Sequence, residues 1–384
     1  MTDFADSERL LLNVVAREIA ALARSDPDPR GPLAMAAALL KTVCDSDPRA
    51  AADDSRRVDP DVLLTYLLDA GLVQPGARVE PRRTALGFSK DTYLVALGAE
   101  GSAAAAAAAP ELVLRLDLRA SAVRSTVADE FPLLCRLYDM GFPVAQPLRL
   151  ETDRAIFGRP FIVMRAVPGQ SGHEVGTVNA EEGRAISLEL ASLVARMHGL
   201  DPQGIASGWR APALSPAAEL SAYFSGWRAI WEDVGRGEFP EVDRAYDYLL
   251  RIPFAPERLT LVHGDVDFHN ILVDSGRVTA VLDWEFAHWG DPAEDLGYCR
   301  GPVERRMPWP EFLAAYEAAG GGRVSEDRIR FYNFWRIVRT VTTCAIARQS
   351  FESGANSDLR MAFAGRVLLR EWVERAGKAS ADFL

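Results

Sequence analysis

The chain has 384 residues, of which 48% are hydrophobic and 25% are charged, and its formal net charge is −11. This is the composition of a globular protein of two or three domains, and it excludes a chain that is disordered throughout. The negative charge disfavours nucleic acid as a partner, because its phosphates would be repelled. No apolar stretch approaches the roughly 20 residues of a membrane-spanning helix, so we expect no membrane partner either.

The amino terminus and the cysteines indicate a cytoplasmic protein. Asp3, Asp6 and Glu8 precede any apolar run, which is the reverse of the basic start of a secretory signal. The four cysteines are far apart and include no C-x-x-C pair. This spacing argues against a zinc knuckle and against a disulfide framework, so we expect reduced, buried thiols.

The first 57 residues are expected to form a helical extension. Apolar residues recur at helical spacing over residues 7–24 and again over residues 33–43. After a polar stretch, Asp59-Pro60 supplies an N-cap followed by proline at the first helical position, and Gly71 supplies a stop. A new domain therefore begins near residue 58.

The pattern changes to strands after this helix. Residues 82–97 alternate around the turn Gly87-Phe88-Ser89 and predict a β-hairpin. The alanine run over residues 103–109 is too short for a stable isolated helix, so we expect it to be a surface connection. Three further elements are expected before residue 167: a strand over residues 112–116, a helix over residues 125–140 and a buried strand over residues 161–166.

Helices dominate the rest of the chain, apart from residues 259–284, which have the pattern of strands and loops. The predicted fold is therefore α+β. A small strand-rich lobe over residues 58–166 precedes a larger helical lobe over residues 167–384, with a cleft between them. The expected helices span residues 180–200, 216–234, 241–250, 307–319, 326–350 and 359–376.

The densest polar cluster in an apolar setting lies within residues 261–273. Asp265 and Asn270 stand five apart, as in a loop where a carboxylate meets a substrate hydroxyl and an amide oxygen binds magnesium. A strand over residues 278–282 then delivers Asp283, a carboxylate that can hold the metal bridging the phosphates of ATP. These three residues are candidates for catalysis and for magnesium binding.

Three motifs, taken in their order and spacing, resemble the aminoglycoside phosphotransferase family, which has a protein-kinase-like two-lobe fold. The resemblance covers the chain from about residue 58 onward. It implies that the protein is a kinase acting on a hydroxyl of a small molecule, with ATP and Mg²⁺ as cofactors, Asp265 as the catalytic base, and Asn270 and Asp283 as Mg²⁺ ligands. His263 and Asp295 would brace the catalytic loop. The motifs are His263-Gly264-Asp265 with Asn270, Leu282-Asp283-Trp284-Glu285, and Gly290-Asp291-Pro292 with Asp295-Leu296.

The amino-terminal lobe carries weaker matches in the expected order. Its predicted hairpin turn has one glycine where many relatives have two. Arg115 takes the place of the phosphate-binding lysine of kinases, and it keeps the charge but approaches phosphate as a planar fork. Glu130 follows in the next helix, where the ion-pair partner of that lysine is expected. The nucleotide contacts implied by the resemblance are Gly87, Ser89, Arg115, Glu130 and, in the hinge strand, Met164 and Ala166.

The acceptor is predicted from the helix over residues 326–350, which in this fold would line the substrate side of the cleft. Arg336 and Arg339 stand three apart there and share a face with aromatic residues. The stretch over residues 331–336 also resembles the branch of the family fused to acyl-CoA dehydrogenases. A basic face favours an anionic acceptor, such as a hydroxyacyl compound, over a polycationic aminoglycoside. Phosphorylation of an aminoglycoside is the alternative.

Two other classes of function stay open. His263, Asp265, Asp267 and His269 form an alternating set of nitrogen and oxygen ligands, which would suit Zn²⁺ in a metallohydrolase. A catalytically silent nucleotide-binding protein on the kinase fold is the other alternative, although intact Asp265, Asn270 and Asp283 argue against it.

Overall fold

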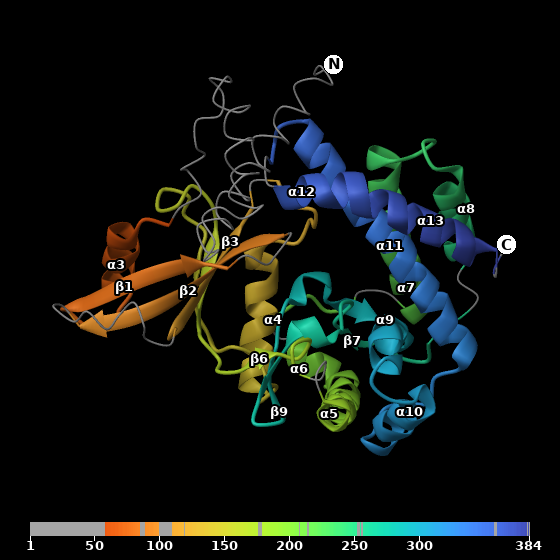
Figure 1. The fold of residues 1–384 in the computed structure, drawn as a ribbon, viewed down its shortest axis with the longest axis horizontal. Coiled ribbons are helices and arrows are strands. Elements are labelled where there is room, and N and C mark those ends of the chain that lie inside the picture. Colours follow the sequence, from red (N-terminus) through yellow and green to blue (C-terminus); the bar gives the residue numbers. More distant parts are fainter. Residues whose placement is uncertain are drawn as a thin grey trace, which may run out of the picture.

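The computed structural model describes residues 58–84, 89–99, 110–118, 120–175, 179–206, 208–212, 215–251, 254, 256–356, 359–381 and 383. The extension predicted for residues 1–57, the connection over residues 103–109 and the predicted turn glycine Gly87 lie outside them. The described chain forms a strand-rich lobe and, beside it, a larger helical lobe (Figure 1). The predicted α+β fold is therefore confirmed.

The strand-rich lobe is built on one antiparallel sheet of five strands in the order β1-β2-β3-β5-β4. The predicted hairpin is β1 and β2, in which Arg83 pairs with Tyr93. Strand β4 was not predicted, and it forms the edge beside β5. The bounds are β1 Ala77–Arg83, β2 Lys90–Ala99, β3 Leu112–Asp117, β4 Pro147–Glu151 and β5 Phe161–Arg165.

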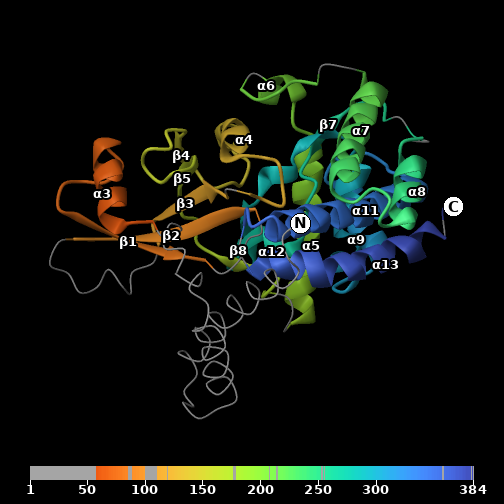
Figure 2. The same cartoon turned by 90° about the horizontal axis from the view of Figure 1, so that it is seen from above.

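One helix packs against each face of this sheet. Helix α3 (Pro60–Asp69) begins at the predicted N-cap, where the Asp59 side chain accepts from the backbone N–H of Asp61 at 2.8 Å. Its Leu63 and Leu67 pack with alternate residues of β2, β3 and β5. Helix α4 (Val127–Asp139) covers the opposite residues of β5. Figure 2 shows α3 and α4 at separate places along the lobe.

The helical lobe contains the predicted helices, with shifts of a few residues at their ends. A helix that the sequence did not predict, α9 (Ala293–Glu304), follows the third motif. The predicted last helix is divided by a π-helical turn over Ala364–Leu368. The bounds are α5 Ala180–His198, α6 Pro202–Ala206, α7 Pro216–Val234, α8 Pro240–Leu249, α10 Trp309–Ala318, α11 Glu326–Glu352, α12 Leu359–Phe363 and α13 Leu369–Ser380. None of the described helices combines the length and apolarity needed to cross a membrane.

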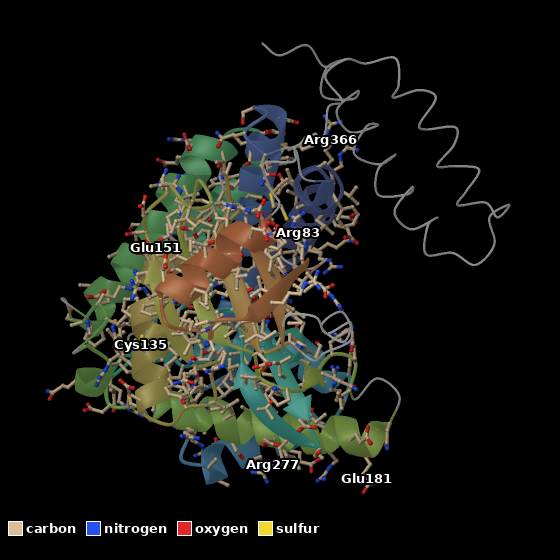
Figure 3. All side chains as sticks on the ribbon, turned by 90° about the vertical axis from the view of Figure 1, so that its left-hand side faces the viewer. Arg83, Cys135, Glu151, Glu181, Arg277 and Arg366 are labelled. Atoms are coloured by element: carbon tan, nitrogen blue, oxygen red, sulfur yellow. The ribbon has the colours of Figure 1, made fainter. Side chains whose placement is uncertain are left out.

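Short strands of the helical lobe hold the polar cluster of the sequence in place. Strand β7 (Thr260–Val262) pairs with β10 (His288–Gly290), and the loop after β7 carries the first motif. The hairpin of β8 (Ile271–Asp274) and β9 (Arg277–Val281) follows, and it pairs with β6 (Gln170–Ser171). At the tip of this hairpin, Arg277 reaches α5 and pairs with Glu189 at 3.2 Å (Figure 3).

Helix α11, 27 residues long, runs through the helical lobe and contacts both α9 and α13. It crosses α9 so closely that a Cβ on Gly297 would lie 2.8 Å from the Asn333 nitrogen. At its far end the Ser350 hydroxyl donates to the carbonyl of Ala120 at 3.4 Å, and the Asn356 side chain donates to the same carbonyl at 2.7 Å. Ala120 lies between β3 and α4, so α11 also reaches the strand-rich lobe.

Candidate functional site

The loop after β7 is fixed from below by one buried carboxylate. Asp295, in the first turn of α9, accepts from the backbone N–H groups of His263 (3.0 Å) and Gly264 (2.8 Å) and from His198 Nε2 (3.0 Å). Burial opposes the charged form, but the hydrogen bond from His198 and the neighbouring histidines outweigh it, so the pKa of Asp295 is lowered. His263 and Asp295, both predicted to brace the loop, therefore meet in the structure.

Asp265 and Asn270 meet within this loop. The Asn270 amide nitrogen donates to the Asp265 backbone oxygen (2.9 Å) and to its carboxylate (2.8 Å). This use of the nitrogen leaves the amide oxygen of Asn270 for another partner. Tyr298, from α9, is a further neighbour of the Asp265 carboxylate, and local sequence spacing does not reveal it. Burial raises the pKa of Asp265, and its neighbours, His269 first, reduce that rise.

Arg115 joins the two lobes. From β3, its guanidinium donates to Glu130 of α4 (3.0 Å) and to Asp283, which follows β9 (2.9 Å). Burial alone would lower the pKa of Arg115, but these two carboxylates raise it above its ordinary value. The structure thus brings together three residues that the sequence assigned to nucleotide and metal binding, although they stand up to 168 positions apart.

Asp283 holds an unusual backbone conformation for a residue with a side chain. Its φ is 62° and its ψ is 67°, in the left-handed region. Such a conformation costs free energy in a non-glycine residue and persists only where the surrounding structure enforces it. The turn aims the Asp283 carboxylate back towards Arg115, so the strain serves the position of a predicted metal ligand.

Two further charged residues belong to the site: Lys90, which was not predicted from the sequence, and Glu285, which is part of the second motif but was given no role there. Glu285 lies two positions after Asp283 in the sequence and near the predicted nucleotide contact Ser89 in the structure. Burial and the nearby Asp283 carboxylate raise the pKa of Glu285 well above its ordinary value. Lys90 opens β2 and is buried beside Glu130. The charge of Lys90 next to the predicted turn was the signal that could have identified it.

The two arginines of the predicted acceptor face differ in their surroundings. Arg339 is 3% exposed, and it donates to the Gly264 carbonyl and to Glu294 (3.2 Å). Its guanidinium is therefore occupied by protein groups, which departs from the open basic face that we expected. Arg336 is half-buried, and its guanidinium lies 5.3 Å from the centre of the Tyr298 ring and 5.5 Å from that of Trp372. Its Nε has no hydrogen-bond partner among the described residues.

The predicted hinge strand is β5, which ends one residue before Ala166. The side chain of Met164, on this strand, is buried in the hydrophobic core. The backbone N–H of Ala166 already donates to the carbonyl of Glu111 at 2.9 Å. In this conformation, adenine would therefore have to meet the carbonyl of Ala166 and not its N–H.

The hydrogen bonds of His263 argue against the metallohydrolase alternative. Its Nδ1 accepts from the Asp265 backbone N–H (3.2 Å), which leaves Nε2 protonated to donate to the Leu282 carbonyl (2.9 Å). Neither nitrogen has a lone pair free for a metal. Within the described ranges, no group of three His, Cys, Asp or Glu residues is placed to hold a metal ion.

Comparison with known sequences gives matches across the middle of the chain. The model of the phosphotransferase enzyme family, APH, matches residues 81–332. Acyl-CoA dehydrogenase family member 11 of Mus musculus is 29% identical over 174 residues, which cover 44% of this chain and 22% of that protein. Viomycin phosphotransferase of Streptomyces vinaceus is 29% identical over 167 residues, covering 41% of this chain and 55% of that protein. The match thus spans less than a quarter of the dehydrogenase-family relative and about half of the viomycin enzyme.

Comparison with solved structures supports the same fold. Aminoglycoside phosphotransferase APH(4)-Ia, solved with ADP and hygromycin B, is 17% identical with a TM-score of 0.54, covering 83% of this chain and 98% of that chain. A second aminoglycoside phosphotransferase, solved with GDP and kanamycin, has a TM-score of 0.55 at 16% identity, covering 84% and 99%. The predicted protein-kinase-like fold is thereby confirmed. Since the family model spans well over half of its length, this chain belongs to the phosphotransferase enzyme family, APH.

Proposed function

We propose that the protein is a small-molecule kinase that transfers the γ-phosphoryl group of ATP to a hydroxyl. The observation that carries this proposal is the bridge from Glu130 through Arg115 to Asp283, next to the loop with Asp265 and Asn270. Phosphoryl transfer needs a cation for the phosphates, oxygen ligands for magnesium and a carboxylate for the acceptor hydroxyl. Family membership supports the same reaction class.

Asp265 is the proposed catalytic base. Its carboxylate is 13% exposed, and Asn270 fixes it from the side. An acceptor hydroxyl would donate to this carboxylate and give up its proton to it as the oxygen attacks phosphorus. The bond between phosphorus and the bridging oxygen of ADP breaks as the new one forms. Tyr298 lies beside the same carboxylate, and a hydrogen bond from its hydroxyl would hold Asp265 in one orientation as the acceptor arrives.

Arg115 is the proposed contact to the α- and β-phosphates. Both of its terminal nitrogens are used by carboxylates in this conformation, at 3.0 Å and 2.9 Å. A guanidinium can keep Glu130 with one nitrogen and offer the other edge to phosphate, which a single ammonium group cannot do with the same rigidity. Ser89 and the carbonyl of Ala166 complete the proposed nucleotide contacts among the described residues.

The residues of the site fit Mg²⁺. Asp283 offers a carboxylate, Asn270 offers its unused amide oxygen, and both are the hard oxygen ligands that Mg²⁺ prefers. Glu285 adds a buried carboxylate oxygen with no hydrogen-bond partner, beside Asp283. When bound, Mg²⁺ would neutralise the charge of the phosphates and of these carboxylates. The neighbours solved with ADP and with GDP fit a purine nucleotide, and we propose ATP.

The proposed acceptor carries a negative charge, for example on a carboxylate, a phosphate or an acyl-carrier group, and a hydroxyacyl compound meets this description. Arg336 supports this choice, because its cation lies beside Tyr298, the residue that contacts Asp265, and its Nε has no partner among the described residues. Arg339 instead supports the loop through Gly264. An aminoglycoside acceptor is the alternative, and it is favoured by the structural neighbours solved with hygromycin B and with kanamycin.

The test is a panel of hydroxylated acceptors, including hydroxyacyl compounds and antibiotics, incubated with the protein and Mg-ATP. Acceptor-dependent release of ADP and a phosphorylated product seen by mass spectrometry are expected with an anionic member of the panel. Release only with kanamycin-type compounds would support the alternative. Activity without ATP or magnesium would contradict the kinase assignment.

A further inference from the structure

The site contains a second buried cation that the proposed chemistry does not use. Lys90 is the first residue of β2, directly after the predicted nucleotide-covering turn, and it is 2% exposed. Its neighbour across the sheet is Asp117, at the end of β3, the strand that carries Arg115. A lysine is rarely buried to this degree unless its charge is paired, so its partners are informative.

Lys90 Nζ makes one short hydrogen bond and faces three carboxylates. It donates to the Ser125 carbonyl at 2.6 Å, immediately before the N-cap of α4. Oxygens of Glu130, Asp117 and Glu285 lie 3.4, 3.7 and 3.9 Å away. These groups come from α4, from the end of β3 and from the segment after Asp283. The ammonium group of Lys90 thus lies close to each of the three segments that supply Arg115, Glu130 and Asp283.

Glu130 is shared between the two cations. Its Oε2 accepts from Arg115 at 3.0 Å, while its Oε1 faces Lys90 at 3.4 Å. That second oxygen and the Oε2 of Glu285 are buried without a hydrogen-bond partner among the described residues, and Lys90 Nζ lies 3.4 Å from the first and 3.9 Å from the second. The orientation of the Glu130 carboxylate, and with it that of Arg115, therefore depends on Lys90.

We propose that Lys90 is a positioning residue that holds Glu130, and through it Arg115, in the conformation that receives the nucleotide phosphates. This inference rests on the proposed kinase function and adds a residue to its machinery. Lys90 does not contact the phosphates, because its ammonium group is enclosed by protein groups and is almost without solvent exposure. Its effect reaches the nucleotide only through the Arg115 guanidinium.

If Lys90 acts through Arg115, its loss should weaken binding of the phosphates and not of the adenosine part of the nucleotide. Adenosine would contact the hinge but not Arg115, whereas ADP would contact both. Replacing Lys90 with methionine keeps the aliphatic length of the side chain and removes the charge. In Lys90→Met, the Kd for ADP with Mg²⁺ is expected to rise about tenfold, which is the loss of one charge-assisted hydrogen bond. The Kd for adenosine should change less than twofold.

The matched control is Arg82→Met, which removes a cation from the neighbouring strand β1. Arg82 is exposed and pairs with Glu80 of its own strand at 3.3 Å. Calorimetric titration of the wild type, this control and Lys90→Met with both ligands decides the matter. Equal ADP affinity in all three proteins, or an equal loss for ADP and adenosine in Lys90→Met, would overturn the inference. A wild type that binds adenosine but shows no gain for ADP would overturn the kinase proposal itself.

A second variant separates positioning from charge balance. Adding Asp117→Asn to Lys90→Met removes one of the carboxylates that Lys90 compensates, while the asparagine oxygen can still accept from the Val127 N–H, as Asp117 does at 2.9 Å. We expect the melting temperature of the double variant to recover towards the wild type, with ADP affinity still reduced. If ADP affinity recovers together with the melting temperature, Lys90 acts only by balancing charge and the inference fails.

Discussion

Asp265 is the residue on which the proposed reaction depends most directly. In Asp265→Asn, the side chain keeps its shape and one oxygen for the Asn270 amide, but it can no longer take a proton from the acceptor. We expect kcat to fall by about 10³-fold, within the range seen for loss of a general base, with ADP affinity unchanged. Steady-state kinetics with the best acceptor and calorimetry with ADP measure the two effects. Undiminished turnover in this variant would contradict the assigned role.

Asp295 stabilises the catalytic loop through its hydrogen bonds to the backbone of His263 and Gly264. In Asp295→Asn, an NH₂ group would face a backbone N–H of residue 263 or 264, and the cost is expected to be about 3 kcal/mol. Because the pKa of Asp295 is lowered by folding, its contribution is complete above pH 4 and is lost as pH falls through the lowered value. Urea unfolding of both proteins at pH 7, 5 and 3.5 should show the difference shrinking only at the lowest pH. A difference independent of pH would mean that charge plays no part.

The sequence predicted those site residues whose chemistry depends on local spacing. Asp265 and Asn270 are five apart on one loop, and their contact follows from that spacing. Lys90 and Tyr298 could not be found in the same way, because their partners come from other elements and only the folded chain brings them close. The burial of Arg339 was missed for the same reason, since helical spacing gives a face but not what covers it.

Helices α9 and α11 cross in close contact beneath the site. In Gly297→Ala, the added methyl group would lie 2.8 Å from the Asn333 nitrogen and the Ile329 oxygen, so the two helices must separate. We expect a loss of about 2 kcal/mol in unfolding free energy, typical of overpacking. The control is Gly226→Ala in α7, where no atom lies within 4 Å of the new Cβ, and a gain of about 1 kcal/mol is expected. Equal stability of the two variants would argue against a close crossing.

Helix α11 also contains Arg336, on which the proposal of an anionic acceptor rests. In Arg336→Ala, the cation beside Tyr298 is lost, and the KM for an anionic acceptor should rise about tenfold, with the KM for ATP unchanged. Arg330→Ala, on an exposed position of the same helix, is the control and should change neither constant. A KM that is unchanged in both variants would favour an uncharged or cationic acceptor.

Helices and strands were predicted well where apolar residues recur regularly over a long stretch of sequence. They were predicted poorly where glycine, proline or a short length interrupts that pattern. Helix α9 contains Gly297, Gly301 and Pro302, which mask a helical pattern, and its packing on α11 overrides their low propensity. Strand β4 has only five residues and is stabilised by pairing with β5. Local sequence cannot reveal a strand of this kind, because its hydrogen-bond partners are remote.

For the whole molecule, the domain boundary near residue 58 stays a prediction. A chain beginning at residue 58 retains every described element and the N-cap Asp59, so we expect it to bind ADP within twofold of the full chain. Calorimetry of both proteins at equal magnesium concentration measures this. If the shorter chain folds, as judged by circular dichroism, but loses ADP binding, the first 57 residues take part in the site.

Several contacts hold the two lobes together besides the chain after β5. Ser350 and Asn356 donate to the Ala120 carbonyl, and Arg115 donates to Asp283. These bonds must break before the lobes can part. Arg115 and Asp283 therefore act as a clasp between the lobes, and a ligand that draws either of them away would loosen the lobes as it binds.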